Sequence, residues 1–330
     1  DGIRDLVRSR GLGDVYKRQI ELPSFYVDFN DRRQNPNNYK SSSRDVRAHL
    51  EQFKRDGVDG VILDLRNNGG GGLDEAITMA GLFVGRKPIV IVRQASGARI
   101  TVHRSREEAI YEGPLLVMLN RFSASASEIL AGAMHDYQRA ILVGDRTTFG
   151  KGTVQNIVQL PEGYGALKVT IAQFYRVSGW STQNRGVETD MILPSINDAR
   201  DLGESTLENA LPWKAISPIS YTPVGNIRRY INELQRYSHD RLSKDTDFKE
   251  IEENVQEFLI NVKPLEYTSI LKMQEDAAKR KEERDEEMAS ARKTMENTTQ
   301  EESEEETASN EETTIPVSYT HLTLPTNREV

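Results

Sequence analysis

A serine, a lysine and a glutamine within one short stretch of the chain have the types and spacing needed for hydrolysis. Ser125 lies in the run SASAS, Lys151 lies between two glycines in TFGKGTVQ, and Gln155 follows four residues after the lysine. A serine hydroxyl is a poor nucleophile until a base takes its proton, and a lysine becomes that base when burial lowers its pKa toward neutrality. Ser–Lys pairs are a known variant of the Ser–His–Asp arrangement. The pattern therefore favours a hydrolase.

Each of these residues also has an ordinary structural interpretation. After SASAS, the apolar residues from Ile129 to Met134 have the spacing of a helix with one buried face. A small residue at the start of a helix is commonly only a cap, and a lysine at a turn is commonly exposed to solvent. The hydrolase interpretation therefore requires the fold to bring the serine and the lysine together.

Four contiguous glycines, Gly69 to Gly72, follow the apolar run GVILDLRNN and precede an amphipathic helix pattern. Glycine amides at a helix N-terminus bind anions, so a phosphate loop is one interpretation. The dinucleotide fingerprint needs spaced glycines, and the segment from Gly144 to Lys151 has five residues between its glycines where a P-loop has four. Nucleotide binding is therefore disfavoured. An oxyanion hole is the better use of these amides, and a flexible turn that needs positive φ is the alternative.

The elements around these loops alternate between strands and helices. IELPSFYVDF, from Ile20, is predicted to be a strand, and the polar stretch NDRRQNPNNYKSSS is predicted to be a loop. Ser43 is the expected N-cap of a helix that buries one face and ends at Gly57. The buried positions of that helix are Val46, Leu50 and Phe53.

Two further strands, PIVIVRQ and PLLVMLN, are separated by a polar stretch that contains His103. The alternation predicts an α/β layered core with a largely parallel sheet, whose ligands bind at the carboxyl ends of the strands. The loops that begin at Asn67 and Asn120 both leave such ends, so we expect them to converge on one site.

The remainder of the chain divides by pattern. ALKVTIAQFYRVSG, from Ala166 to Gly179, predicts a strand whose edge aligns an extended peptide. INELQRY, FKEIEENVQEFL and LKMQEDAAKRKEE have helical spacing and many charges, with Pro264 between two of the helices. EESEEETASNEETT has no large apolar residue and predicts a disordered, solvated tail.

Composition excludes several classes of protein. The chain has 330 residues and no cysteine, which excludes disulfides and thiolate metal sites. Its net charge of -8 argues against nucleic-acid binding. No stretch approaches the roughly 18 apolar residues of a membrane helix.

Both ends of the chain differ in character from the middle. Residues 1–19 (DGIRDLVRSRGLGDVYKRQ) and 317–330 (VSYTHLTLPTNREV) resemble translated adapter sequences that flank assembled metagenomic fragments. We therefore expect the native part to begin at Ile20 and to end near Pro316. An ordinary basic N-terminal arm is the alternative for the first flank.

Four motifs in order carry a family resemblance: LDLRNNGGGGLDEA, NRFSASASEILAGAMHDY, TFGKGTVQ and AQFYRVSGWSTQNRGVETD. Together they resemble the carboxyl-terminal-processing, or tail-specific, serine proteases of bacteria, over Ile20 to about Ser195. NALPW, ending at Trp213, is similar to the long periplasmic branch of that family. The resemblance implies an α/β protease core, related in architecture to the enoyl-CoA hydratase fold, with a helical C-terminal extension and a disordered acidic tail.

The resemblance also implies roles for individual residues. Ser125 is the nucleophile, Lys151 the general base and Gln155 the group that orients the lysine. The amides of Gly70, Gly71 and Ala126 form the oxyanion hole.

Two departures from the family pattern bear on these roles. The chain has one additional residue between Gly144 and the TFGK motif, which leaves Ser127 as the alternative to Ser125, and GVETD replaces the usual GVTPD. Asp136 and Glu128 are expected to have structural roles, the latter as a capping residue. His135 is the one histidine of the five that falls within a quoted motif, and the resemblance gives it no role, so a histidine triad is disfavoured.

The sequence thus predicts a serine endopeptidase that needs no cofactor and no metal. Its expected substrates are proteins with apolar C-termini. By resemblance, a PDZ domain that lies upstream in the family delivers these substrates. Because we expect the native part to begin after that domain, we expect this chain to capture substrates poorly. A periplasmic or envelope location and an envelope adaptor are expected by resemblance. Neither a nucleic-acid partner nor a membrane span is expected.

The expected organisation is a catalytic core at 20–198, a helical extension at 199–295 and an acidic tail at 296–316, between the flanks 1–19 and 317–330. Two other functions remain open for the core, namely an enoyl-CoA hydratase and a non-catalytic peptide-binding module.

Overall fold

The computed structural model describes residues 8–11, 17–36, 38–97, 99–161, 163–260 and 279. The chain divides into two compact units, Asp1–Ile260 and Asn261–Val330. Every helix and strand described below belongs to the first unit.

The larger sheet has six strands and is mostly parallel. In spatial order its strands are β1 (Arg8–Gly11), β2 (Lys17–Glu21), β3 (Gly60–Asp64), β6 (Leu115–Leu119), β7 (Ile141–Gly144) and β10 (Met191–Ile192). The pair β1–β2 is antiparallel, and the other four pairs are parallel. Because β3 and β6 are parallel neighbours, the loops that follow them leave the same edge of the sheet.

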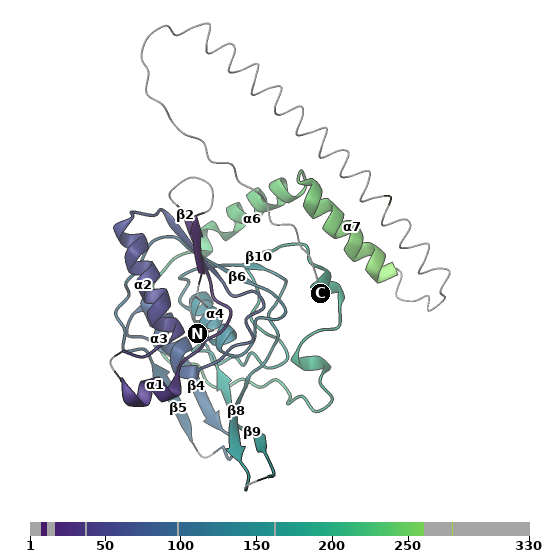
Figure 1. The fold of residues 1–330 in the computed structure, drawn as a ribbon. Coiled ribbons are helices and arrows are strands. Elements are labelled where there is room, and N and C mark those ends of the chain that lie inside the picture. Colours follow the sequence, from purple (N-terminus) through teal and green to yellow (C-terminus); the bar gives the residue numbers. More distant parts are fainter. Residues whose placement is uncertain are drawn as a thin grey trace, which may run out of the picture. The chain divides into compact units, whose positions relative to one another are not determined.

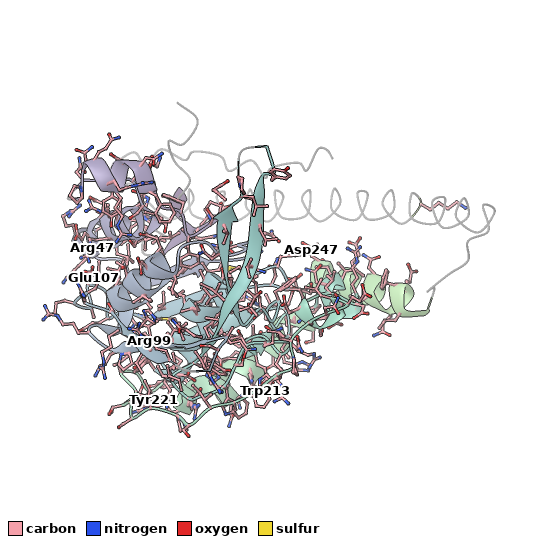
Figure 2. All side chains as sticks on the ribbon, turned by 90° about the horizontal axis from the view of Figure 1, so that it is seen from below. Arg47, Arg99, Glu107, Trp213, Tyr221 and Asp247 are labelled. Carbon is pink, nitrogen blue, oxygen red and sulfur yellow. The ribbon has the colours of Figure 1, made fainter. Side chains whose placement is uncertain are left out.

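Three helices pack with this sheet to form the core, and Figure 1 shows their arrangement. They are α2 (Ser42–Arg55), α3 (Leu73–Val84) and α4 (Ala126–Asp136). Val46, Leu50 and Phe53 of α2 are buried, which confirms the prediction from their spacing. An ion pair between Arg47 of α2 and Glu107 ties this helix to the segment before β6, and Figure 2 shows the two side chains together.

The N-cap of α2 differs from the prediction. The helix begins after Ser41, two residues earlier than a cap at Ser43 would allow. The Ser43 amide instead donates to Glu75 Oε2 of α3 over 2.8 Å. Consecutive serines have equal local capping ability, so the contact between α2 and α3 determines where α2 begins.

The second sheet is antiparallel, which the sequence did not predict. Its strands, in spatial order, are β5 (Ile100–Arg104), β4 (Pro88–Gln94), β9 (Ala166–Tyr175) and β8 (Thr153–Gln159). PIVIVRQ therefore pairs with β5 and β9 and does not extend the parallel sheet. An apolar strand has the same local pattern in both settings, and only its partners distinguish them. Figures 1 and 2 show β8 and β9 projecting as a hairpin.

The strand with the expected peptide-aligning edge, β9, lies between β4 and β8, and its register pairs it with both neighbours only at residues 172–173. β9 pairs with β4 through residues 172–175 and with β8 through residues 166–173. In this sheet β8 is the terminal strand on that side. Edge or interior position depends on which strands pair, and alternation along one strand does not carry that information.

The N-terminal segment differs from the prediction. Of the strand predicted for IELPSFYVDF, only Ile20 and Glu21 lie in a strand, and Phe29 begins a helix. The expected polar loop includes α1 (Phe29–Gln34), whose first turn is capped by the carboxylate of Asp28. Residues 8–11 and 17–19 of the adapter-like flank lie in β1 and β2. Backbone groups make the ladder of a sheet whatever the side chains are, so the foreign origin of this flank stays a prediction.

The segment after β10 contains the helices predicted for INELQRY and FKEIEENVQEFL, which lie in the last two of its elements. Its elements are α5 (Ile196–Ala199), a 3-10 turn (Glu204–Thr206), α6 (Arg228–Leu242) and α7 (Thr246–Ile260). Apart from Lys279, the predicted helix LKMQEDAAKRKEE lies outside the described residues, as do the acidic tail and the flank 317–330. Among the described helices, none has the length and apolar character to cross a membrane.

Candidate active site

The loops after β3 and β6 meet, as the sequence predicts. The backbone N–H of Asn67 donates to Asn120 Oδ1 over 2.9 Å, and Asn120 Nδ2 donates to Asn67 Oδ1 over 2.8 Å. The N–H of Ala124 donates to the carbonyl of Asn68 over 3.0 Å. These bonds hold the glycine loop against the segment that carries the serines.

The three serines of SASAS have different environments. Ser123 is buried and donates to the carbonyl of Leu65 over 2.8 Å. Ser127 is also buried, and its hydroxyl donates to the carbonyl of Asn68 over 2.8 Å. Ser125 is partly exposed and immediately precedes α4, with φ of 57° and ψ of −110°. A non-glycine residue with positive φ is uncommon and is typical of functional sites.

Lys151 lies in the loop before β8, where neighbouring segments fix its backbone. Its carbonyl accepts from Thr182 Oγ1 over 3.0 Å, and the next amide, Gly152 N–H, donates to Gln183 Oε1 over 2.9 Å. Its side-chain Nζ donates to Gln155 Oε1 over 3.0 Å. The amine therefore points along β8, toward the glutamine that the sequence analysis paired with it.

Ser125, Lys151 and Gln155 line one cavity of about 350 Å³. Its remaining wall is mainly small or apolar and is formed by Gly69, Gly71, Leu73, Ala126, Ile129, Thr153, Val154, Lys168 and Phe174. The pKa of Lys151 is lowered, first by burial and then by the positive charge of Lys168, while Glu204 and Glu128 act in the other direction. A lysine in this setting is suited to accept a proton.

Glu128 connects the serine to the lysine loop. This fully buried carboxylate accepts from the backbone N–H of Ser125 (2.8 Å), of Gly150 (2.7 Å) and of Lys151 (2.9 Å), and from Thr148 Oγ1 (2.6 Å). The bond to Ser125 confirms the predicted capping role. The bonds to the lysine loop were not predicted, because they span more than twenty residues of sequence.

Replacing Glu128 with glutamine should destabilise the fold in a pH-dependent way. The glutamine amide turns an N–H₂ group toward N–H donors, which should lower the free energy of unfolding by about 2 kcal/mol or more. Burial raises the pKa of Glu128 from 4.5 to about 7. The folded state therefore keeps a proton that the unfolded state releases, so the stability from this group is greatest in acid and falls as pH rises through that interval.

The measurement is urea unfolding of the parent and of Glu128→Gln at about pH 5 and about pH 8. The parent's advantage over the variant should be larger at the lower pH. Glu75→Gln removes another buried carboxylate with a backbone bond and serves as the control for general destabilisation. An advantage that is equal at both pH values would contradict the assignment.

Two of the three expected oxyanion donors line the cavity, namely Gly71 and Ala126. Ala126 is the first residue of α4, where amides have no intrahelical acceptor. Gly70 N–H instead donates to Asn68 Oδ1 over 2.9 Å, so in this conformation it is engaged within its own loop, which differs from the expectation. A Cβ on Gly70 would lie 2.8 Å from the Cβ of Ser125, so the glycine is needed for close approach.

Asp136 lies at the last turn of α4, about 16 Å along the helix from Ser125 at 1.5 Å per residue. It pairs with Arg176 and accepts from Ser178 Oγ over 3.1 Å. Its neighbour His135 contacts the same arginine. Both are therefore remote from the serine, in agreement with a structural role for Asp136.

The sequence analysis gave no individual role to three residues near Lys151, although it singled out the segments that contain Gln183 and Lys168. Gln183 holds Gly152, Glu204 accepts from Gln183 Nε2 over 3.3 Å, and Lys168 lines the cavity. Their local sequences have no feature that indicates these contacts. Through Glu204, the C-terminal extension nevertheless contacts Gln183, which in turn holds the lysine loop at Gly152.

Comparison with known proteins now identifies the class. The model of peptidase family S41 matches residues 19–193, more than half of the chain, and the model described as the C-terminal domain of tail specific protease matches residues 197–321. The chain belongs to peptidase family S41.

The relatives are named as proteases. A tail-specific protease of Haemophilus influenzae is 41% identical over 247 residues, covering 72% of this chain and 33% of the relative. A carboxy-terminal-processing protease of Bartonella bacilliformis is 39% identical over 225 residues, covering 64% of this chain and 49% of the relative. The chain thus spans between a third and a half of these relatives.

Among solved structures, a photosystem II D1 C-terminal processing protease is similar at a TM-score of 0.44 and 32% identity. The match covers 54% of this chain and 42% of that one.

Proposed function

We propose that this chain contains the catalytic part of a serine endopeptidase in which Ser125 and Lys151 form a dyad. The observation that carries the proposal is the shared cavity of Ser125, Lys151 and Gln155, with Glu128 bonded to the backbones of both the serine and the lysine. Membership of family S41 supports the same reaction class.

The first half of the reaction forms an acyl-enzyme. Ser125 Oγ attacks the peptide carbonyl, and its proton passes to Lys151 Nζ. The carbonyl oxygen becomes negative and is stabilised by the amides of Gly71 and Ala126 and by the N-terminal end of the α4 dipole. Collapse of the intermediate breaks the C–N bond, and Lys151 returns the proton to the leaving amine.

The second half regenerates the enzyme. Lys151 takes a proton from water as the water attacks the ester of Ser125, and the same two amides stabilise the second intermediate. The carboxylic product leaves and the proton returns to Ser125. Gln155 accepts a hydrogen bond from the lysine amine throughout and fixes its direction. These steps need no cofactor.

An extended peptide is the substrate that fits the sheet beside the cavity. β8 is a terminal strand, and its first residues Thr153, Val154 and Gln155 line the cavity. Backbone pairing along β8 would hold a peptide across Ser125 with little dependence on its side chains. We assign this role to β8, because it is the terminal strand of the sheet, whereas β9 lies between β8 and β4.

The names of the relatives support a substrate that is recognised at its C-terminus. We propose that apolar C-terminal residues are preferred and that the protein acts in the processing or degradation of envelope proteins, with an envelope adaptor as a partner. The periplasmic location and the adaptor rest on the family resemblance.

The function is tested by incubating the chain with a denatured protein and identifying new termini by mass spectrometry, with a fluorophosphonate probe in a parallel sample. We expect cleavage at internal peptide bonds and attachment of the probe to Ser125. Intact substrate together with no probe on Ser125 would reject the proposal. Peptide binding without cleavage would favour the binding module, and hydration of an enoyl-CoA would favour the hydratase.

A further inference from the structure

The cavity wall contains two charged residues, and both are lysines. Lys151 and Lys168 line it, whereas its other described lining residues are glycines, apolar residues, a serine, a threonine and a glutamine. Two ammonium groups at one cavity with no acid on its wall repel each other. This arrangement is unfavourable unless one of the two amines loses its proton.

Lys168 is not neutralised by its surroundings. It lies on β9, where it pairs in register with Ile157 of β8, and it is exposed. Within the described part of the chain, the side-chain amine of Lys168 forms no hydrogen bond or ion pair. Its side chain is exposed to water and lines the cavity without a paired acid.

The two carboxylates that act on Lys151 are engaged elsewhere. Glu128 of α4 is fully buried and accepts four hydrogen bonds from backbone amides and Thr148. Glu204 of the 3-10 turn accepts from Gln183 Nε2. The lysine amine donates to the neutral amide of Gln155 instead of either acid. Two acids, Glu128 and Glu204, thus oppose the effect of Lys168 on Lys151, and neither of them pairs with the Lys151 amine.

We propose that Lys168 is a positioning residue for the base, because its positive charge at the same cavity keeps the amine of Lys151 unprotonated. The inference rests on the proposed role of Lys151 in accepting the proton of Ser125. Lys168 itself touches neither the reacting atoms nor the nucleophile.

The order of the electrostatic effects on Lys151 agrees with this geometry. Burial lowers its pKa most, Lys168 lowers it next, and Glu204 and Glu128 raise it by less. Of the charged groups around the amine, Lys168 therefore has the largest influence. Because Lys168 is exposed, its effect should weaken as salt screens the repulsion.

The direct test measures the protonation of Lys151 without using catalysis. The parent, Lys168→Gln and Lys168→Arg are acetylated with trace acetic anhydride over a pH series, and modification of Lys151 is quantified by mass spectrometry. Only the neutral amine reacts. Near neutral pH, Lys151 should be labelled several-fold more slowly in Lys168→Gln than in the parent, and Lys168→Arg should restore the parent rate because arginine keeps the charge.

Lys54→Gln is the matched control, since it removes an exposed lysine on α2, away from the cavity. Circular dichroism confirms that each variant is folded. The difference between the parent and Lys168→Gln should shrink at high salt. An identical labelling titration of Lys151 in the parent and Lys168→Gln would overturn the inference, as would a change that Lys168→Arg fails to reverse.

Activity supplies an independent readout. The pH profile of kcat/KM should shift to higher pH in Lys168→Gln and return in Lys168→Arg. If Ser125→Ala cleaves as well as the parent, the proposed function fails. The labelling experiment would still test separately whether Lys168 controls the protonation of Lys151. If labelling shifts but the pH profile does not, Lys151 is not the base and the inference fails as stated.

Discussion

Ser125→Ala is expected to reduce kcat/KM for a denatured protein substrate by at least about 10⁴-fold, because no acyl-enzyme forms without the hydroxyl. Ser127→Ala, two residues away, should retain most of the activity. The Ser127 hydroxyl is buried and donates to the carbonyl of Asn68, so its loss should cost about 1 kcal/mol of stability. The two alanine variants separate the two candidate nucleophiles.

Cleavage rates, probe labelling and thermal unfolding are measured together on both variants. Ser125→Ala should keep a folded structure, because it retains the backbone N–H that donates to Glu128. Loss of activity in Ser127→Ala with full activity in Ser125→Ala would transfer the role of nucleophile to Ser127. Activity in the double variant would exclude a serine dyad.

Lys151→Arg should lower kcat by roughly 10²–10⁴-fold, the usual contribution of a positioned general base. Arginine keeps a positive charge and a hydrogen bond to Gln155 but does not lose its proton in the working pH range. Lys151→Met should be equally inactive, since it lacks any base. Equal losses in these two variants would show that proton transfer, and not charge, is what the lysine supplies.

The pH dependence follows from the same residue. Only the neutral amine accepts the proton of Ser125, so kcat/KM of the parent should rise with pH as Lys151 deprotonates. Because burial and Lys168 lower its pKa, this rise should occur below the ordinary range of a lysine. A profile that is flat across neutral pH, or full activity in Lys151→Met, would contradict the assignment.

Short motifs allowed much of the site to be predicted before the structure. The glycine loop, SASAS at a helix start and TFGKGTVQ each depend on residues adjacent in sequence. Such backbone conformations are encoded locally, since glycine permits positive φ and small residues permit close approach. The parallel order of β3 and β6 also followed from the alternation of strands and helices, and it brought Asn67 to Asn120.

The tertiary structure decided which groups surround those motifs. It buried Ser127 and left Ser125 at the cavity, engaged the Gly70 amide with Asn68, and placed PIVIVRQ in a second sheet. Local patterns do not distinguish these outcomes. An apolar strand has the same sequence pattern in a parallel and in an antiparallel sheet, and neighbouring serines have the same side chain.

The chemistry of the lysine shows the same division. Its type and its glycine neighbours are properties of the sequence, and they made Lys151 a candidate base. Its protonation depends on burial and on charges contributed by Lys168, Glu204 and Glu128, which are distant in sequence. Electrostatic interactions depend on distance in space and on solvent exposure, so only the folded chain sets them.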